Sequence, residues 1–292
     1  MMPLSSPKKI SARKPFTLTV VSGKGGVGKT NTACNIAVTL ASYGKKVLLF
    51  DADLGLASVD VLFGIFPRYT IQHLLNNQCI AAEVLIEGPG GISILPATSG
   101  TSEFADRKAE DTDKISGLVA EIGRAFDFVI IDAPSGIAAN MQSMAAIADE
   151  VLLLTTPEPT SVMDAYVVTK ILSARNPEQP LKLLVNMITE HDTGERVSAG
   201  FHEVVLRFLD RQIETIGQVP FDPYVALAVR RQQAFSVCYP DCPASRCLRL
   251  LSLRLLSRAT QTYSTVAALN SWSHAGSMGV NRIVSWLGPK SE

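Results

Sequence analysis

The sequence predicts an α/β fold, with a mainly parallel central sheet flanked by helices on both faces. Short apolar segments typical of strands alternate with longer segments of helical periodicity along the 292-residue chain. The strand-like segments are almost continuously aliphatic, which indicates a sheet that is buried on both sides. In addition, 47% of the residues are hydrophobic and the formal net charge is zero, so one large core is possible and general attraction to nucleic acid is not indicated.

The first predicted unit is a strand, a glycine-rich loop and a helix. Residues 17–21 form an apolar run typical of a buried strand, and the small and aliphatic residues of segment 30–40 fit a helix. Between them, residues 23–30 read Gly-Lys-Gly-Gly-Val-Gly-Lys-Thr, which matches the G-x-x-x-x-G-K-[ST] pattern of a phosphate-binding loop. Because this motif requires a strand before it and a helix after it, the sequence predicts a P-loop NTPase fold.

The loop contains the residue types that phosphate binding needs. Its glycines let the backbone bend around an anion, and the helix that follows adds the partial positive charge of its N-terminus. We expect Lys29 to reach the β- and γ-phosphates of a nucleotide and the Thr30 hydroxyl to bind Mg²⁺. A second lysine, Lys24, lies inside the glycine run, where it either raises anion affinity locally or reaches a phosphate on a neighbouring subunit.

The remaining elements continue the alternating pattern. We expect further strands at residues 46–50, 92–95, 127–131, 151–155, 181–185 and 216–219, and helices at 115–126, 161–174 and 195–213. No clear linker separates these elements, so residues 16–260 are predicted to form one domain. A basic arm is expected at 1–15, a flexible tether at 261–276 and an amphipathic helix at 277–288.

Carboxylates follow two of the predicted strands. Asp51 and Asp53 come after the strand at 46–50, and Asp132 comes after the strand at 127–131. Ligands of open α/β sheets bind at the carboxyl ends of the strands. Asp132 has the form of a Walker B aspartate that holds Mg²⁺ through water. Of the other two carboxylates, one can support the metal while the other orients or deprotonates the attacking water.

Several of these segments together resemble a known family. Residues 22–30, 51–64 and 131–137 are similar to the MinD/ParA class of deviant-Walker-A ATPases, and the similarity extends over residues 16–250. Residues 156–166 and 185–187 resemble the flagellar-number regulators (FlhG) within that class more than the cell-division members. The resemblance implies ATP and Mg²⁺ as cofactors and a homodimer in the ATP state, with the nucleotide sandwiched between two subunits.

The resemblance also implies roles for individual residues. Lys24 of one subunit would contact phosphates bound by the other, Asp53 would position water, Asp51 would assist the metal, and Asp132 would sense the γ-phosphate next to the mobile Gly136. Asn186 would read adenine, although an Asn after a strand also forms turns. The implied catalytic residues are Lys24, Asp51 and Asp53; the nucleotide-binding residues are Gly23, Lys24, Gly25, Gly26, Val27, Gly28, Lys29, Thr30, Asn31 and Asn186; the metal ligands are Thr30, Asp51 and Asp132.

The last residues of the chain have an amphipathic pattern. Apolar side chains recur at helical spacing and resemble the membrane-targeting helix of this family; they are Val280, Ile283, Val284, Trp286 and Leu287. Such a short helix binds a bilayer only marginally, so two copies in a dimer would be needed for stable attachment. We therefore expect a cytoplasmic protein that is peripheral at the inner face of the cell membrane in the ATP state. The alternative is a helix that packs onto the protein itself or onto a partner.

Other assignments follow from the resemblance or compete with it. A FlhF-like GTPase or flagellar basal-body components are the implied partners, although residues 1–15 lack the N-terminal activating motif of many relatives. A partition or division-site ATPase that acts on DNA or the membrane is the competing function. Nucleic acid is not the expected partner, but one arginine cluster keeps DNA binding open: Arg230, Arg231, Arg246, Arg249, Arg254 and Arg258.

Three of the five cysteines lie close together in the sequence. The spacing of Cys238, Cys242 and Cys247 is not that of a zinc site, and Pro240 and Pro243 between them are typical of turns. We expect ordinary loop or buried thiols here rather than metal ligands.

Overall fold

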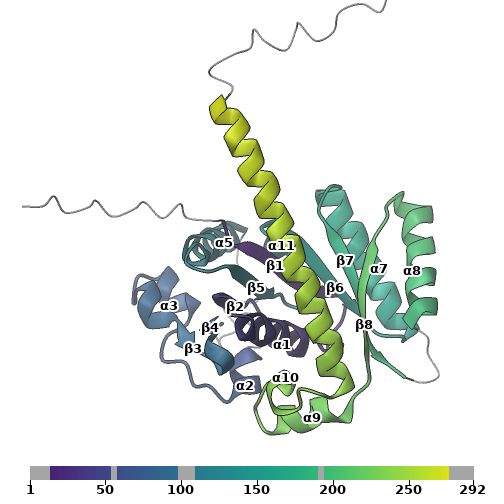
Figure 1. Cartoon of the computed structure of the whole chain (residues 1–292), viewed down its shortest axis with the longest axis horizontal. Helices are drawn as coiled ribbons and strands as arrows, with labels where there is room; N and C mark the ends of the chain where they lie inside the picture. The colour runs from purple at the N-terminus through teal and green to yellow at the C-terminus, as the bar shows by residue number, and fades with distance from the viewer. Residues whose placement is uncertain (1–13, 54–57, 98–108, 190–193, 276–292) are drawn as a thin grey trace, which may run out of the picture. The chain divides into compact units, whose positions relative to one another are not determined.

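The computed structural model describes residues 14–53, 58–97, 109–189 and 194–275 (Figure 1). Its centre is an eight-stranded sheet in the order β3-β4-β2-β5-β1-β6-β7-β8. Every neighbouring pair is parallel except β3 and β4, which are antiparallel. The strands are β1 (Phe16–Ser22), β2 (Val47–Asp51), β3 (Ile86–Glu87), β4 (Ser93–Leu95), β5 (Phe128–Asp132), β6 (Glu150–Thr155), β7 (Leu181–Ile188) and β8 (Glu214–Pro220).

Helices connect these strands. They are α1 (Lys29–Ser42), α2 (Val59–Phe63), α3 (Ile71–Leu75), α4 (Ala81–Val84), the 3₁₀ helix η1 (Pro89–Gly91), α5 (Ala109–Gly123), α6 (Ala139–Ala146), α7 (Pro159–Arg175), α8 (Gly194–Leu209), α9 (Pro223–Arg230), α10 (Phe235–Cys238) and α11 (Pro243–Ala275). The predicted α/β fold with a mainly parallel sheet is confirmed, and all of the predicted strands are present.

Both faces of the sheet are buried, as the aliphatic strands predicted. Leu48 and Phe50 belong to one core cluster with Val119 of α5 and Phe201 of α8. Leu49 lies between them in sequence and is fully buried outside that cluster, on the opposite face of β2, where α1 packs against the strand. The alternation places α5, α6, α7 and α8 on one face of the sheet and α1 on the other.

Some predicted helices end earlier than expected, and several short ones were not predicted. The helix expected at 195–213 ends at Leu209 because Asp210 takes a left-handed conformation, with φ of 48°, and the chain then turns into β8. The helix expected at 115–126 ends at Gly123. Helices α6, α9 and α11 were not predicted. Four further unpredicted helices, α2, α3, α4 and α10, have only four or five residues each. Such lengths do not complete a periodic pattern.

The compact unit that ends at Ser252 holds the whole sheet. Helix α11 continues through residues 261–275, the stretch expected to be a tether. The basic arm, except residues 14 and 15, and the amphipathic residues Val280, Ile283, Val284, Trp286 and Leu287 lie outside the described residues. The domain boundaries therefore stay predictions. Within the described ranges, no helix is long and apolar enough to cross a membrane.

Asp222 connects the first turns of two helices. One carboxylate oxygen accepts a hydrogen bond from the N–H of Tyr224 in α9, and the other accepts from the N–H of Ala244 in α11, both at 3.0 Å. The side chain is buried. Burial alone would raise the pKa of this carboxyl, but hydrogen bonds from Ala244, Cys242 and Tyr224 hold the pKa below its usual value.

We expect Asp222→Ala to lower the free energy of unfolding by about 2 kcal/mol, because each lost helix cap costs about 1 kcal/mol. Urea denaturation at pH 7 measures this, and Asp241→Ala, which changes an exposed carboxylate nearby, is the control. Because the folded-state pKa is depressed, the stabilisation by the charge is present above about pH 4 and is lost as the pH falls through the folded-state pKa. An advantage of wild type over Asp222→Asn that stayed constant from pH 6 to pH 3 would contradict this account.

Candidate functional site

The glycine-rich loop joins the carboxyl end of β1 to the first turn of α1. Gly26 and Gly28 have φ angles of 81° and 89°, which lie in the left-handed region that favours glycine. A Cβ on Gly28 would lie 2.4 Å from Nδ2 of Asn186, and a Cβ on Gly23 would lie 2.4 Å from the backbone carbon of Asp164. The glycines therefore provide both the curvature of the loop and its close packing against β7 and α7.

Lys29 and Thr30, at the start of α1, both contact Asp132 at the end of β5. The Nζ atom of Lys29 lies 2.7 Å from Oδ1 of Asp132, and the Thr30 hydroxyl donates to Oδ2 at 2.6 Å. Burial raises the pKa of the Asp132 carboxyl above its usual value, although Lys29 and Thr30 act in the opposite direction. The lysine and the hydroxyl predicted for phosphate and Mg²⁺ thus meet the predicted switch carboxylate.

Asp51 is the register neighbour of Asp132 on the adjacent strand. Its carboxylate accepts hydrogen bonds from the backbone N–H groups of Asp53, Ser58 and Val59 at 3.1, 2.9 and 3.0 Å, and so stabilises the start of α2. Burial, together with the charge of Asp132, raises the pKa of Asp51 to about 7. The half-buried Asp53 lies two residues beyond the end of β2.

These oxygen ligands fit Mg²⁺. Asp51 and Asp132 are carboxyl groups on neighbouring strands, and burial raises the pKa of both above the usual value. The Thr30 hydroxyl contacts Asp132 and lies 3.0 Å from the Ser58 hydroxyl. Mg²⁺ typically takes one or two carboxylates together with phosphate oxygens and water, so a cage of protein ligands is not needed.

Lys24 contacts its own chain rather than the rest of the phosphate loop. Its Nζ forms an ion pair with Glu158 and lies 3.2 Å from the Thr160 hydroxyl, at the start of α7. The Lys24 side chain is 32% exposed and the Glu158 side chain 65%, so the ion pair lies at the surface of the site. The contact of Glu158 with Lys24 was not expected from the sequence, although the Thr-Pro-Glu-Pro-Thr segment at 156–160 carries part of the family resemblance.

Asn186 lies beside the loop, at the end of a cavity. Its Nδ2 donates to the carbonyl oxygen of Val27 at 2.8 Å, and the side chain is buried. The cavity has a volume of about 400 Å³ and opens next to Gly28 and Asn31. Its other walls come from residues 219–222 and from α9. Neither segment was expected from the sequence to belong to the site. The only sequence signal was the Pro-Phe-Asp-Pro run after β8.

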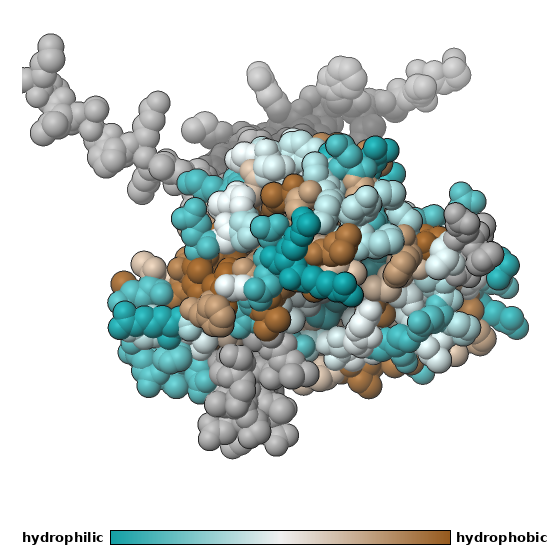
Figure 2. Space-filling view, turned by 90° about the horizontal axis from the view of Figure 1, so that it is seen from below, coloured by the Kyte–Doolittle hydropathy of each residue, from teal (hydrophilic) through white to brown (hydrophobic). Residues whose placement is uncertain are grey.

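Exposed apolar residues also lie on this part of the molecule. Phe221, Tyr224 and Leu227 are 62%, 46% and 41% exposed, at the end of β8 and on α9. Helices α9 and α10 lie at the bottom of Figure 1, and Figure 2 views the molecule from that side. On this face the hydrophobic residues form separate patches among hydrophilic ones. Patches of this kind are too interrupted to argue for one continuous apolar docking face.

Two of the three clustered cysteines have hydrogen-bond partners within the protein. The thiol of Cys238 donates to the Ala234 carbonyl oxygen at 3.0 Å, and Sγ of Cys242 lies 3.2 Å from the Ser245 hydroxyl. Burial raises the pKa of the Cys242 and Cys247 thiols, which disfavours the thiolate that metals bind. Among the described residues, no group of three or more His, Cys, Asp or Glu side chains is arranged to hold a metal ion.

Comparison with known proteins identifies the family. A ParA family model, described as NUBPL iron-transfer P-loop NTPase, matches residues 15–255. Antiactivator FleN of Pseudomonas aeruginosa is 36% identical over 249 residues, 85% of this chain and 89% of that protein. Flagellum site-determining protein YlxH of Helicobacter pylori is 34% identical over 198 residues, 66% of each chain. The cell-division ATPase MinD of Pyrococcus furiosus has a similar fold, with a TM-score of 0.72, 21% identity, and coverage of 83% of this chain and 98% of that one.

The chain therefore belongs to the ParA family of P-loop NTPases. It is a P-loop ATPase of the MinD/ParA type, with ATP and Mg²⁺ as its cofactors. The family, the enzyme class and the cofactors expected from the sequence are confirmed. The roles assigned to individual site residues stay predictions.

The geometry of the loop gives a test that needs no nucleotide. We expect Gly28→Ala to lower the free energy of unfolding by about 1–3 kcal/mol. The new methyl group would clash with Asn186, and the backbone at position 28 is in the left-handed region that alanine disfavours. Gly25→Ala is the matched control, since a Cβ there meets nothing within 4 Å. Urea denaturation of the nucleotide-free protein compares the two variants. Equal losses would show that the loop does not pack against β7 as described.

Proposed function

We propose that this ATPase is an ATP-dependent dimerising switch that associates reversibly with the membrane and regulates the number or placement of flagella. The observation that carries the proposal is the similarity to FleN over 85% of the chain. YlxH, whose name assigns it to flagellum site determination, supports the same conclusion. The protein would be cytoplasmic and would lie at the inner face of the cell membrane in the ATP state, with a FlhF-like GTPase or basal-body components as partners.

The surroundings of Lys24 support the dimer. Lys24 is partly exposed, and its Glu158 partner is more exposed still, so a neighbouring subunit can reach this ion pair. If Lys24 exchanges Glu158 for a phosphate of the other subunit, one charge-assisted contact replaces another. Ile137 and Met163 are 51% and 62% exposed, and each is next in sequence to a residue that packs against the loop region. A second subunit would cover these apolar side chains.

The residues at the ends of β2 and β5 and at the start of α1 would carry out hydrolysis. Thr30, Asp51 and Asp132 would hold Mg²⁺, which would supply positive charge to neutralise the phosphate oxygens. Asp53 would orient the attacking water or accept its proton. Water adds to the γ-phosphorus while the bond to the β–γ bridging oxygen breaks, which gives ADP and phosphate. Lys29 and the neighbour's Lys24 would neutralise the charge that develops on the departing oxygens.

Membrane association would follow from dimerisation. The amphipathic residues at 280–287 lie outside the described residues, so their role rests on sequence. One short apolar face with few cations gives marginal affinity, whereas two linked copies multiply it through effective concentration. ATP would therefore control attachment through the monomer–dimer equilibrium, and hydrolysis would release the protein.

The dimer can be tested by size-exclusion chromatography with light scattering. We expect Asp53→Ala with saturating Mg-ATP to form a dimer, because binding is retained while hydrolysis is lost. Adding Lys24→Ala to this variant should give a monomer that still binds ATP, and Lys24→Ala alone should lose hydrolysis. Lys170→Ala, which removes an exposed lysine of α7, is the control. A strict monomer for Asp53→Ala under saturating Mg-ATP would refute the sandwich model.

The membrane role can be tested with vesicles and in cells. We expect full-length Asp53→Ala to sediment with anionic phosphatidylglycerol vesicles only when ATP is present. A chain that ends at Gly276 should dimerise but stay in the supernatant, and should fail to restore flagellar number in cells that lack the protein, as counted by electron microscopy. Continued sedimentation would place the membrane contact elsewhere. Salt-sensitive, ATP-dependent retention on DNA without vesicle binding would favour the partition function instead.

A further inference from the structure

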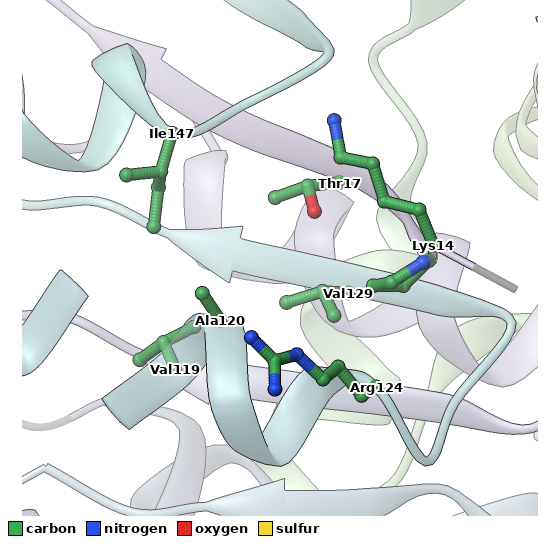
Figure 3. Close-up of a pocket in the computed structure, with 8 residues that line it drawn as sticks. Lys14, Thr17, Val119, Ala120, Arg124, Val129 and Ile147 are labelled. Carbon is green, nitrogen blue, oxygen red and sulfur yellow. The ribbon is translucent and has the colours of Figure 1, made fainter. Parts of the chain in front are cut away.

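A second cavity lies at the opposite end of the strands from the phosphate loop. It has a volume of about 450 Å³, within the range of about 300–1,000 Å³ that is typical of small-molecule sites. It lies at the amino ends of β1 and β5, on the face covered by α5 and α6. Figure 3 shows Val119 and Ala120 of α5, Val129 of β5 and Ile147 around it. These side chains give the cavity an apolar wall.

Thr17 contributes a hydroxyl to the wall of this cavity. Thr17 is 7% exposed, and Figure 3 shows its side chain among the residues that line the cavity. No described residue forms a hydrogen bond with that hydroxyl. Thr19, two residues further on the same face of β1, donates instead to the carbonyl oxygen of Met144 at 2.8 Å. The Thr17 hydroxyl oxygen is accessible from the cavity, so a ligand bound there can form a hydrogen bond with it.

One of the two cationic side chains that line the cavity is not paired with a carboxylate. The Nζ of Lys14 lies 2.6 Å from Oδ1 of Asp149, whose other oxygen accepts the N–H of Thr17 at 2.9 Å, so the lysine charge is balanced. Arg124 follows the last residue of α5, and Figure 3 shows its guanidinium beside Ala120. Among the described residues the Arg124 side chain has no acidic partner. The net local charge of these three side chains is therefore that of one cation.

We propose that this cavity binds a small amphipathic carboxylate. The apolar chain of the ligand would lie against Val119, Val129 and Ile147. Its carboxylate would pair with Arg124, whose planar fork of N–H donors matches two carboxylate oxygens, and would accept a hydrogen bond from Thr17. The chain's own segment at residues 1–13 has no carboxylate side chain to offer Arg124, because its charged residues are Lys8, Lys9 and Arg13.

Isothermal titration of the full-length, nucleotide-free protein with sodium decanoate tests the proposal. We expect saturable binding of one decanoate per chain. Arg124→Gln should weaken the affinity about ten- to a hundredfold, as the loss of a charge-assisted hydrogen bond does. Arg175→Gln, which makes the same change at the exposed end of α7, is the control and should leave the affinity unchanged. Decan-1-ol, which lacks the charge, should bind both variants equally.

Two further variants locate the ligand. Thr17→Val keeps the shape of the side chain but removes the hydroxyl, and should weaken decanoate binding several-fold. Ala120→Phe places a ring at the exposed mouth of the cavity and should abolish binding without loss of folding, as checked by circular dichroism. Three results would overturn the proposal: no saturable binding by wild type, equal affinities for Arg124→Gln and Arg175→Gln, or binding that appears only after residues 1–13 are deleted.

Discussion

Two buried carboxyl groups lie side by side at the ends of neighbouring strands, and the candidate nucleotide site is arranged around them. Asp51 and Asp132 are 1% and 0% exposed, and one buried lysine, Lys29, pairs with Asp132. Isolated buried carboxylates are costly, and here each is supported by donors: Lys29 and Thr30 for Asp132, and the backbone at the start of α2 for Asp51. Burial still raises the pKa of both groups above the usual value, although these donors act in the opposite direction. A divalent cation with a polyphosphate is the partner that such a site accommodates.

The central sheet and this carboxylate pair could be predicted from sequence because both depend on short-range patterns. Aliphatic runs place the strands, and parallel strands bring their carboxyl ends to one edge, so Asp51 and Asp132 had to lie near the phosphate loop. Short helices such as α2 escaped prediction because four or five residues cannot complete a period. The conformation of Asp210, which ends α8, also has no reliable sequence signal.

The rest of the site could not be predicted because it depends on contacts between segments that are far apart in the chain. Lys24 and Glu158 are separated by 134 positions, and Asn186 meets the carbonyl of Val27 across 159 positions. The resemblance suggested that Lys24 would act on a second subunit, but the residue that holds it within one chain follows only from the packing of α7 beside the loop. The ion pair means that any transfer of Lys24 to a phosphate is an exchange of partners, which keeps its electrostatic cost low.

β1 runs from the cavity at its amino end to the phosphate loop at its carboxyl end, and its polar residues have different partners at the two ends. A strand that is buried on both faces tolerates a hydroxyl only where a partner satisfies it. Ser22, at the carboxyl end, donates to the carbonyl oxygen of Lys24 and so supports the loop, and Thr19 donates to Met144 in α6. Thr17 is the exception within the described part of the strand, and it lies where the cavity and the unpaired guanidinium of Arg124 are. The Thr17 hydroxyl is accessible from the cavity, so it costs the fold little and stays available to a ligand.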